Sequence, residues 1–325
     1  MRNLNGLFKP KSVAIIGASR DHNSVGYGIL RNLNTGCVFQ CKYCKPFLGP
    51  LYPVNPYAEK VQGIRSYSSV LRIEENVDLA IISVPAKIVP NVLEECVEKK
   101  VKAIIVVSAG FAELGKEGKE LQDKIAKIAK IAKIPLLGPN CLGVIRPSSN
   151  LNASFAPSMP PQGNIAFISQ SGALADSIID WAIEARYGFS TVVSYGNKAD
   201  LNVVDFLEYF AQDEETKAIT LYVEGIDNGK EFIEVAKKVS KIKPIIALKA
   251  GRSEHGREAI STHTGSLAGS YKVYEAAFKQ AGVIMADNVE EMFDLAKALA
   301  YQPPCKGNNI AIISNAGGPA VLTTD

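Results

Sequence analysis

The chain has 325 residues, 47% of them apolar, and a formal net charge of +3 at pH 7. At about 150 residues per domain, this length predicts two domains, and the small charge excludes a chain-wide attraction to nucleic acid or anionic membranes. The sequence has neither an apolar run of about 18 residues, as a membrane-spanning helix needs, nor a signal-peptide pattern, so the protein is expected to be soluble and cytoplasmic.

Short apolar runs alternate with helical patterns over the first part of the chain. Strands are expected over 11–16, 51–56, 77–84 and 103–107, and helices over 27–33, 88–99 and 118–132. Strands that alternate with helices indicate a parallel, doubly wound sheet. The predicted fold class is therefore α/β, with a Rossmann-like first domain.

Small or turn-forming residues follow these strands, namely Gly17, Asn55, Pro85 and the segment 108–110. Ligands of doubly wound sheets bind outside the carboxyl ends of the strands, so these four ends predict one site. A glycine turn between a strand and a helix suits a phosphate group, but Gly17 is not followed by the G-x-G-x-x-G spacing of a dinucleotide site. This departure weakens an NAD(P)-dependent oxidoreductase interpretation, as does Asn55 in place of an acidic residue.

A second alternating series follows residue 136. The stretch 136–144 closes the first domain, and the Pro-, Ser- and Asn-rich stretch 146–163 predicts a linker. Strands are then expected over 164–168, 191–194, 218–223, 245–248 and 309–314, and helices over 173–184, 203–210 and 230–239, with another starting near Ser270. The predicted domains are 1–147, a flavodoxin-like unit over 148–302, and the start of a truncated third α/β unit over 303–325, as in a fragment.

Three features of the second domain suggest chemistry. His263 lies in a Gly-, Ser- and Thr-rich loop over 251–269, Glu224 ends an expected strand, and Ser171 with Gly172 opens a helix after another. A helix start attracts anions, and a carboxylate that holds one imidazole nitrogen leaves the other free as a nucleophile. Each residue alone is also consistent with an ordinary surface or capping role. His255 on the same loop is the rival histidine.

The order of nine short motifs along the chain resembles the α part of the ADP-forming (NDP-forming) acyl-CoA synthetases, including the acetate–CoA ligases, in the succinyl-CoA synthetase superfamily. The motifs are VAIIGAS (13–19), YPVNP (52–56), SVP (83–85), SAGFAE (108–113), LLGPNCLG (136–143), ISQSGAL (168–174), SYGNKADL (194–201), YVEGI (222–226) and HTGSLAG (263–269).

The resemblance implies a CoA-binding first domain and a phosphohistidine loop in the second. His263 would carry a phosphoryl group between an acyl phosphate and ADP, with Glu224 orienting it. ADP or ATP and Mg would bind to an ATP-grasp β subunit or domain, so this chain alone would be an incomplete acid–thiol ligase, expected in a hetero-oligomer. The implied phosphate-binding residues are Ser169, Ser171 and Gly172, and the implied CoA-binding residues are Gly17, Ser19, Asn55, Val84, Pro85, Asn140 and Cys141. A buried, inert Cys141 is favoured over a nucleophile.

Two positions depart from the family pattern. Tyr57 replaces a lysine that often follows YPVNP, and Lys60 is a candidate substitute. Cys37, Cys41 and Cys44 form a cluster in an apparent insertion. Their thiolates are candidate ligands of a structural metal, and free or disulfide-linked cysteines are the alternative. The C-x3-C-x2-C spacing also occurs in radical S-adenosylmethionine sites, but its place after a βα unit argues against that chemistry.

The alternative function is a CoA-binding regulatory module of a synthetase-like protein. Such modules usually lack the reactive histidine, so His263 favours the enzyme. The sequence does not define the acyl substrate, the oligomeric state, or whether the partner is a separate chain.

Overall fold

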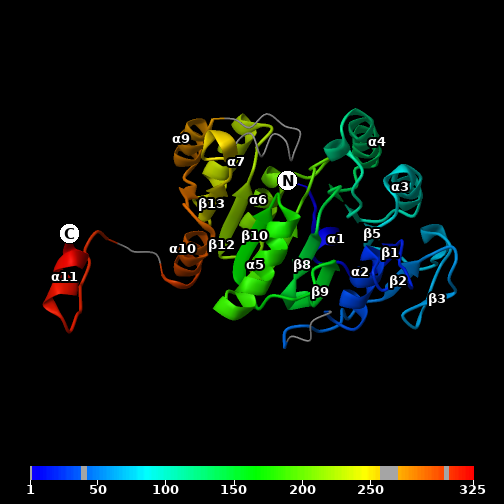
Figure 1. Cartoon of the computed structure of the whole chain (residues 1–325), viewed down its shortest axis with the longest axis horizontal. Helices are drawn as coiled ribbons and strands as arrows, with labels where there is room; N and C mark the ends of the chain where they lie inside the picture. The colour runs from blue at the N-terminus through cyan, green and yellow to red at the C-terminus, as the bar shows by residue number, and fades with distance from the viewer. Residues whose placement is uncertain (1, 38–41, 257–269, 304–306) are drawn as a thin grey trace.

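The computed structural model of the chain describes residues 2–37, 42–256, 270–303 and 307–325. Two sheets form the body, and α11 (Gly317–Thr324) lies apart from it at the C-terminal end (Figure 1). Among the described residues, no helix combines the length and apolar character needed to cross a bilayer.

The described strands of the first sheet are all parallel and follow the order β2-β1-β5-β6-β7. They are β1 (Val13–Ile16), β2 (Leu51–Val54), β5 (Leu79–Ile82), β6 (Ala103–Val106) and β7 (Leu136–Leu137). A hairpin of β3 (Lys60–Val61) and β4 (Ile64–Arg65) follows β2. The strands β1, β5 and β6 are buried throughout, as expected for apolar strands covered on both faces.

Helices cover both faces of this sheet. On one face lie α1 (Asn5–Phe8) and α2 (Val25–Asn34), and on the other lie α3 (Val89–Glu98) and α4 (Lys116–Ala132). Short 3-10 turns connect the elements: η1 (Val70–Arg72), η2 (Ala86–Ile88), η3 (Ala112–Leu114) and η4 (Pro147–Ser149). The described structure therefore confirms the predicted doubly wound first unit.

The second sheet follows the order β14-β13-β12-β10-β11-β8-β9, in which β8 and β9 are antiparallel to their neighbours. Its strands are β8 (Gly143–Arg146), β9 (Leu151–Ser154), β10 (Gln162–Ser169), β11 (Phe189–Ser194), β12 (Ala218–Val223), β13 (Ile245–Lys249) and β14 (Ile284–Met285). Its helices are α5 (Gly172–Ala185), α6 (Val203–Gln212), α7 (Gly229–Val239), α9 (Tyr271–Ala281) and α10 (Val289–Tyr301). The helices α6, α7 and α9 pack on one face, and α5 and α10 on the other.

The two sheets have the same parallel topology. Among the parallel strands of each sheet, the first in sequence (β1 or β10) lies between the second and the third, which gives the flavodoxin-like order 2-1-3-4-5. The chain leaves the first strand toward one side of the sheet and later returns on the other side. This reversal places the carboxyl ends of β1 and β5 in one sheet, and of β10 and β12 in the other, at the position where doubly wound folds bind ligands. We call these two positions the first and the second crevice.

Two sequence predictions are wrong. The stretch 146–163 is not a linker, because β9 and the start of β10 lie within it and β9 is buried beside β8. The stretch 309–314 forms no strand and its side chains are exposed, since no described strand lies beside it to pair with its backbone. The chain also enters the second sheet at Gly143, ahead of the predicted domain boundary at residue 147.

Candidate functional site

The first crevice lies where β1 and β5 end, and its walls are backbone. Gly17 adopts φ +93°, and a Cβ atom there would lie 2.3 Å from the carbonyl oxygen of Ser83. A Cβ on Gly26, in the first turn of α2, would lie 2.0 Å from the carbonyl oxygen of Gly17. Only glycine fits at these two positions, so main chain lines the crevice closely.

The other predicted residues of this edge shape its loops. Asn55 donates from Nδ2 to the carbonyl oxygen of Ala18 (2.7 Å), and the Ser19 hydroxyl accepts from the Asp21 amide (3.0 Å). Behind β5, the Ser108 hydroxyl donates to the Val84 carbonyl oxygen (2.6 Å). Pro85 precedes η2 and forms its cap position. Gly17, Ser19, Asn55, Val84 and Pro85 thus all lie at the carboxyl edge of the first sheet.

The departures at Tyr57 and Lys60 lie beside this edge. Tyr57 is exposed, and its amide donates to Asn55 Oδ1 (2.8 Å). Lys60 is exposed in β3. Lys60 remains a candidate for contact with a phosphate of a ligand at this edge.

The loop between β7 and β8 connects the two sheets. The Asn140 amide donates to the Ser108 carbonyl oxygen (2.9 Å), which ties the loop to the end of β6. On its other side, the Leu142 amide donates to Ser194 Oγ (3.2 Å), at the end of β11. A Cβ on Gly172 would lie 3.5 Å from that same Leu142 amide. Asn140 and Cys141 therefore bridge the first edge and the start of α5.

Cys141 is fully enclosed at this junction. Its Sγ donates to the carbonyl oxygen of Val106 (3.4 Å), and burial raises the pKa of the thiol to about 12. A thiol with such a pKa is almost entirely protonated at neutral pH, and the thiolate is the nucleophilic form. Cys141 is therefore a buried packing residue, as the sequence favoured.

The second crevice begins at the first turn of α5. Ser171 is the N-cap, and its Oγ accepts from the Leu174 amide (3.2 Å), while the Ser171 amide donates to Ser169 Oγ (3.1 Å). Among the described residues, the amides of Gly172 and Ala173 have no acceptor. Two free N–H groups and the positive end of a 14-residue helix favour an anion at this point.

Gln170 joins this helix start to the end of β12. Its Oε1 accepts from the amides of Glu224 and Gly225, and its Nε2 donates to the Gly225 carbonyl oxygen (2.8 Å). The main chain at Glu224 is consequently held beside the anion-binding turn, and Glu224 is only 8% exposed. Gln170 was not predicted as a site residue, because the contacts it makes are to residues more than 50 positions away in the chain.

His263 lies outside the described residues, but both flanks of its segment reach this crevice. On the N-terminal flank, the Ala250 amide donates to the Val223 carbonyl oxygen (3.0 Å). On the C-terminal flank, the Tyr274 hydroxyl accepts from the Ile226 amide (3.0 Å). The two ends of the segment are therefore anchored on either side of Glu224. His255, the rival histidine, is exposed on the N-terminal flank.

A polar bridge, also missed from the sequence, links the edges of the two sheets. Asn197, after β11, donates from Nδ2 to Glu113 Oε2 and to Gln122 Oε1. Glu113 Oε1 accepts from the amides of Gly110 (2.6 Å) and Phe111 (3.1 Å). Burial disfavours the Glu113 carboxylate, but these hydrogen bonds outweigh it and lower its pKa.

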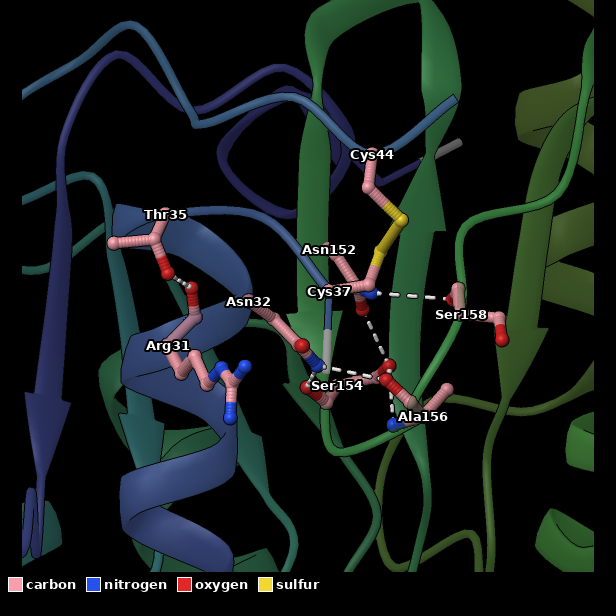
Figure 2. Close-up of a disulfide and its surroundings, with 9 residues drawn as sticks. All are labelled: Arg31, Asn32, Thr35, Cys37, Cys44, Asn152, Ser154, Ala156 and Ser158. Atoms are coloured by element: carbon pink, nitrogen blue, oxygen red, sulfur yellow. Dashed lines mark hydrogen bonds between the residues drawn. A yellow bond between two sulfur atoms is a disulfide. The ribbon is translucent and has the colours of Figure 1, made fainter. Parts of the chain in front are cut away.

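Two of the three clustered cysteines are described, and they are bonded to each other. Cys37 and Cys44 form a disulfide with their Cα atoms 5.5 Å apart, so neither sulfur is a thiolate able to bind a metal (Figure 2). Cys41 lies outside the described residues. No group of three metal-binding side chains occurs in the described part of the chain.

The disulfide sits beside a structural contact instead. Asn32 of α2 donates from Nδ2 to the carbonyl oxygens of Ser154 and Ala156, both at 2.8 Å (Figure 2). Cys37 is buried among apolar residues of the second unit. Asn32 thus fastens α2 to the end of β9, and the disulfide lies beside this contact.

Comparisons with known proteins agree with this two-part layout. Residues 11–147 match the family model of a CoA binding domain, and residues 162–299 match that of a succinyl-CoA ligase-like flavodoxin domain. The chain is 50% identical over 322 residues to the α subunit of acetate–CoA ligase (ADP-forming) II of Pyrococcus furiosus, covering 99% of this chain and 68% of that one. It is 51% identical to acetate–CoA ligase (ADP-forming) of Methanocaldococcus jannaschii, covering 97% of this chain and 43% of that one.

Solved structures give the same result. A dinucleotide-forming acetyl-coenzyme A synthetase 1 of Ca. Korarchaeum cryptofilum, in its apo form, superposes with a TM-score of 0.90 at 41% identity, over 99% of this chain and 68% of that one. The same synthetase solved with phosphate and ADP gives a TM-score of 0.87 at 43% identity, over 94% and 64%. The chain thus spans about two thirds of the α subunit, and less than half of the M. jannaschii relative.

Proposed function

The chain belongs to the ADP-forming acetate–CoA ligase family, and we propose that it supplies the CoA-binding and phosphohistidine parts of such an enzyme. The complete reaction converts acyl-CoA, ADP and phosphate into carboxylate, CoA and ATP, and it is reversible. Phosphate displaces the CoA thiolate to give an acyl phosphate. His263 then takes the phosphoryl group and releases the carboxylate, and ADP takes the phosphoryl group from His263.

The observation that carries this proposal is the connection between the two crevices. The loop over 138–142 contacts the end of β6 through Asn140 and the end of β11 through Leu142, next to Gly172. A CoA molecule held along the first crevice would extend its thiol end toward this loop. The acyl carbon would then lie beside the free amides of α5, where attacking phosphate finds a helix start that favours anions.

Each candidate residue has a role in this scheme. Gly17 and Gly26 let the main chain at the ends of β1 and β5 and at the start of α2 pack closely at the edge where CoA would bind, and Ser19, Asn55, Val84 and Pro85 shape the loops around it. Gly172, with Ala173, presents a free N–H group to the transferred phosphoryl group, and the hydroxyls of Ser169 and Ser171 hold the turn in place by accepting from the amides of Ser171 and Leu174. The Glu224 carboxylate accepts a hydrogen bond from one nitrogen of His263, so the other nitrogen attacks phosphorus as a neutral imidazole.

A partner completes the enzyme. We assign ADP or ATP, with Mg, to an ATP-grasp subunit or domain, because the described residues include no further nucleotide-binding fold. The relatives named as α subunits support a separate partner chain. The regulatory alternative is disfavoured, because the relatives at 50% and 51% identity are named as acetate–CoA ligases.

The test is ATP formation by this protein together with its cognate ATP-grasp partner, supplied with acetyl-CoA, ADP, phosphate and Mg. We expect the wild-type complex and a His255→Ala variant to form ATP, and a His263→Ala variant to form none. Other short acyl-CoA esters in the same assay define the substrate range. ATP formation by the His263→Ala complex at the wild-type rate contradicts the proposal.

A further inference from the structure

Lys249 is a buried cation at the second crevice that the scheme above does not use. It is the last residue of β13, is 4% exposed, and directly precedes the segment that leads to His263. Burying an ammonium group is costly unless hydrogen bonds and nearby charges compensate for the lost water. The groups that contact Lys249 therefore indicate its role.

The three N–H groups of the ammonium have three partners. Lys249 Nζ donates to the carbonyl oxygen of Glu224 (2.9 Å) and to that of Ala250. It also lies 4.5 Å from the ring centroid of Tyr274, as in a cation–π contact. The partners come from the end of β12, from the N-terminal flank of the His263 segment, and from α9 on its C-terminal flank. One side chain thus fastens both flanks to Glu224.

The charge of Lys249 also acts on the Glu224 side chain. Burial lowers the pKa of Lys249, and the negative charge of Glu224 opposes that effect, so the two groups interact electrostatically. A positive charge in this enclosed place favours the ionised form of the carboxylate. The ionised carboxylate is a stronger acceptor than the neutral acid for the hydrogen bond from His263.

Two tyrosines among the described neighbours of this site do not titrate between acidic and neutral pH. Burial, with the nearby Asp227 and Glu224 charges, raises the pKa of Tyr195 well above its usual value. Burial likewise raises the pKa of Tyr222 to about 12. Asp227 forms an ion pair with Lys198 (2.7 Å) at the surface. Among the described residues near Lys249, Glu224 is therefore the buried carboxylic acid that interacts electrostatically with it.

We propose that Lys249 is a positioning residue for phosphoryl transfer, which anchors the flanks of the His263 segment and keeps the Glu224 carboxylate ionised. This inference rests on the proposed function. It assigns Lys249 no contact with substrate. It predicts that the rate of the chemical step, rather than the binding of the CoA ester, depends on this charge.

The test uses a Lys249→Met variant in complex with the ATP-grasp partner, because methionine keeps the length of the side chain and removes its charge. We expect kcat for ATP formation to fall by about tenfold or more, with KM for acetyl-CoA within about twofold of wild type. We also expect the acidic limb of the pH–kcat profile to move up by about half a pH unit or more, since Glu224 loses its neighbouring cation.

Lys243→Met is the matched control. Lys243 precedes the same strand at its other end, donates to the carbonyl oxygens of Phe210 and Asp213 (both 2.6 Å), and also has a pKa lowered by burial. Its loss removes a comparable cation far from the second crevice. We expect it to lower the unfolding temperature and to leave the pH–kcat profile unchanged.

Lys249→Arg keeps the positive charge. This second variant still tests the inference if Lys249→Met does not fold. We expect the acidic limb of the arginine variant to coincide with that of wild type. An unshifted acidic limb in folded Lys249→Met, or a shifted one in Lys249→Arg, overturns the inference. These outcomes are separate from failure of the proposed function, in which the wild-type complex itself forms no ATP.

Discussion

The two crevices of this protein arise from the same strand order but are lined by different kinds of groups. The first, between β1 and β5, is lined by main chain at Gly17 and Ser83 and contains no buried charge. The second, between β10 and β12, holds the buried Glu224 and Lys249 beside a helix start. A neutral backbone cradle suits binding of an extended ligand. Buried opposite charges beside free amides suit a reaction in which charge moves.

The largest effect is expected from Glu224→Gln, which removes the carboxylate and keeps the size of the side chain. An amide orients an imidazole poorly and does not stabilise its positive form, so phosphorylation of the protein should slow by about 100-fold or more. The measurement is rapid-quench labelling by ATP through the partner subunit. CoA affinity, measured by calorimetry, should be unchanged. Equal labelling rates for the variant and wild type would contradict the assignment of phosphoryl transfer to the second crevice.

Gly17→Ala at the first crevice is expected to weaken CoA binding and to leave phosphorylation of the protein intact. The added Cβ would lie 2.3 Å from the Ser83 carbonyl oxygen and at φ +93°, so the loop must move, at a cost of about 1–3 kcal/mol. CoA affinity should fall by about tenfold or more, while labelling by ATP through the partner should persist. Gly28→Ala is the control, because nothing lies within 4 Å of its Cβ position. Equal CoA affinities in the two variants would place the ligand elsewhere.

Reduction of the disulfide should affect stability and leave both crevices intact. The bond closes a loop with a sequence separation of 7, so a dithiol reductant should lower the free energy of unfolding by roughly 2–3 kcal/mol. Urea unfolding with and without reductant measures the difference, and a variant with Cys37→Ala and Cys44→Ala should not respond. A loss of ATP formation on reduction, without loss of stability, would connect the insertion to function.

The smallest effect is expected on folding stability at low pH, when Glu113 becomes protonated. Its folded-state pKa lies below its usual value, so its contribution to stability is complete above about pH 4.5 and is lost as the pH falls through the folded-state pKa. Glu113→Gln should therefore flatten the dependence of stability on pH below that value. Thermal unfolding across this range measures it. An unchanged slope would show that the bridge to Asn197 contributes nothing.

Local patterns predicted most of the helices and parallel strands, because their periodicity reflects burial on one or both faces. They did not predict β9, a strand of four residues (Leu151–Ser154) that are all buried although Asn152 and Ser154 are polar. Ser154 Oγ donates to Asn152 Oδ1, and Asn152 Nδ2 donates to the Ser158 carbonyl oxygen, so burial of these polar groups is compensated by contacts that no short window reveals. The run over 309–314 has strand composition but no described neighbour to pair with. Composition alone could not distinguish these two cases.

The candidate site was predictable only in part for the same reason. Gly17, Ser171 and Glu224 follow strands, and strand ends can be read from the sequence. Gln170, Asn197 and Lys249 act through residues that are distant in the chain or through backbone carbonyls, and their residue types carry no signal. His263 remains a prediction that rests on its motif and on the anchored flanks of its segment.

The most direct test of the account is to locate the phosphoryl group. The complex with the ATP-grasp partner is incubated with ATP and Mg, digested at alkaline pH, and analysed by mass spectrometry with fragmentation that preserves phosphohistidine. We predict one phosphorylated histidine in this chain, His263, with slower incorporation in Glu224→Gln. Phosphate found on His255 or His22 instead, or incorporation that does not depend on Glu224, would contradict the assignment of the reaction to the second crevice.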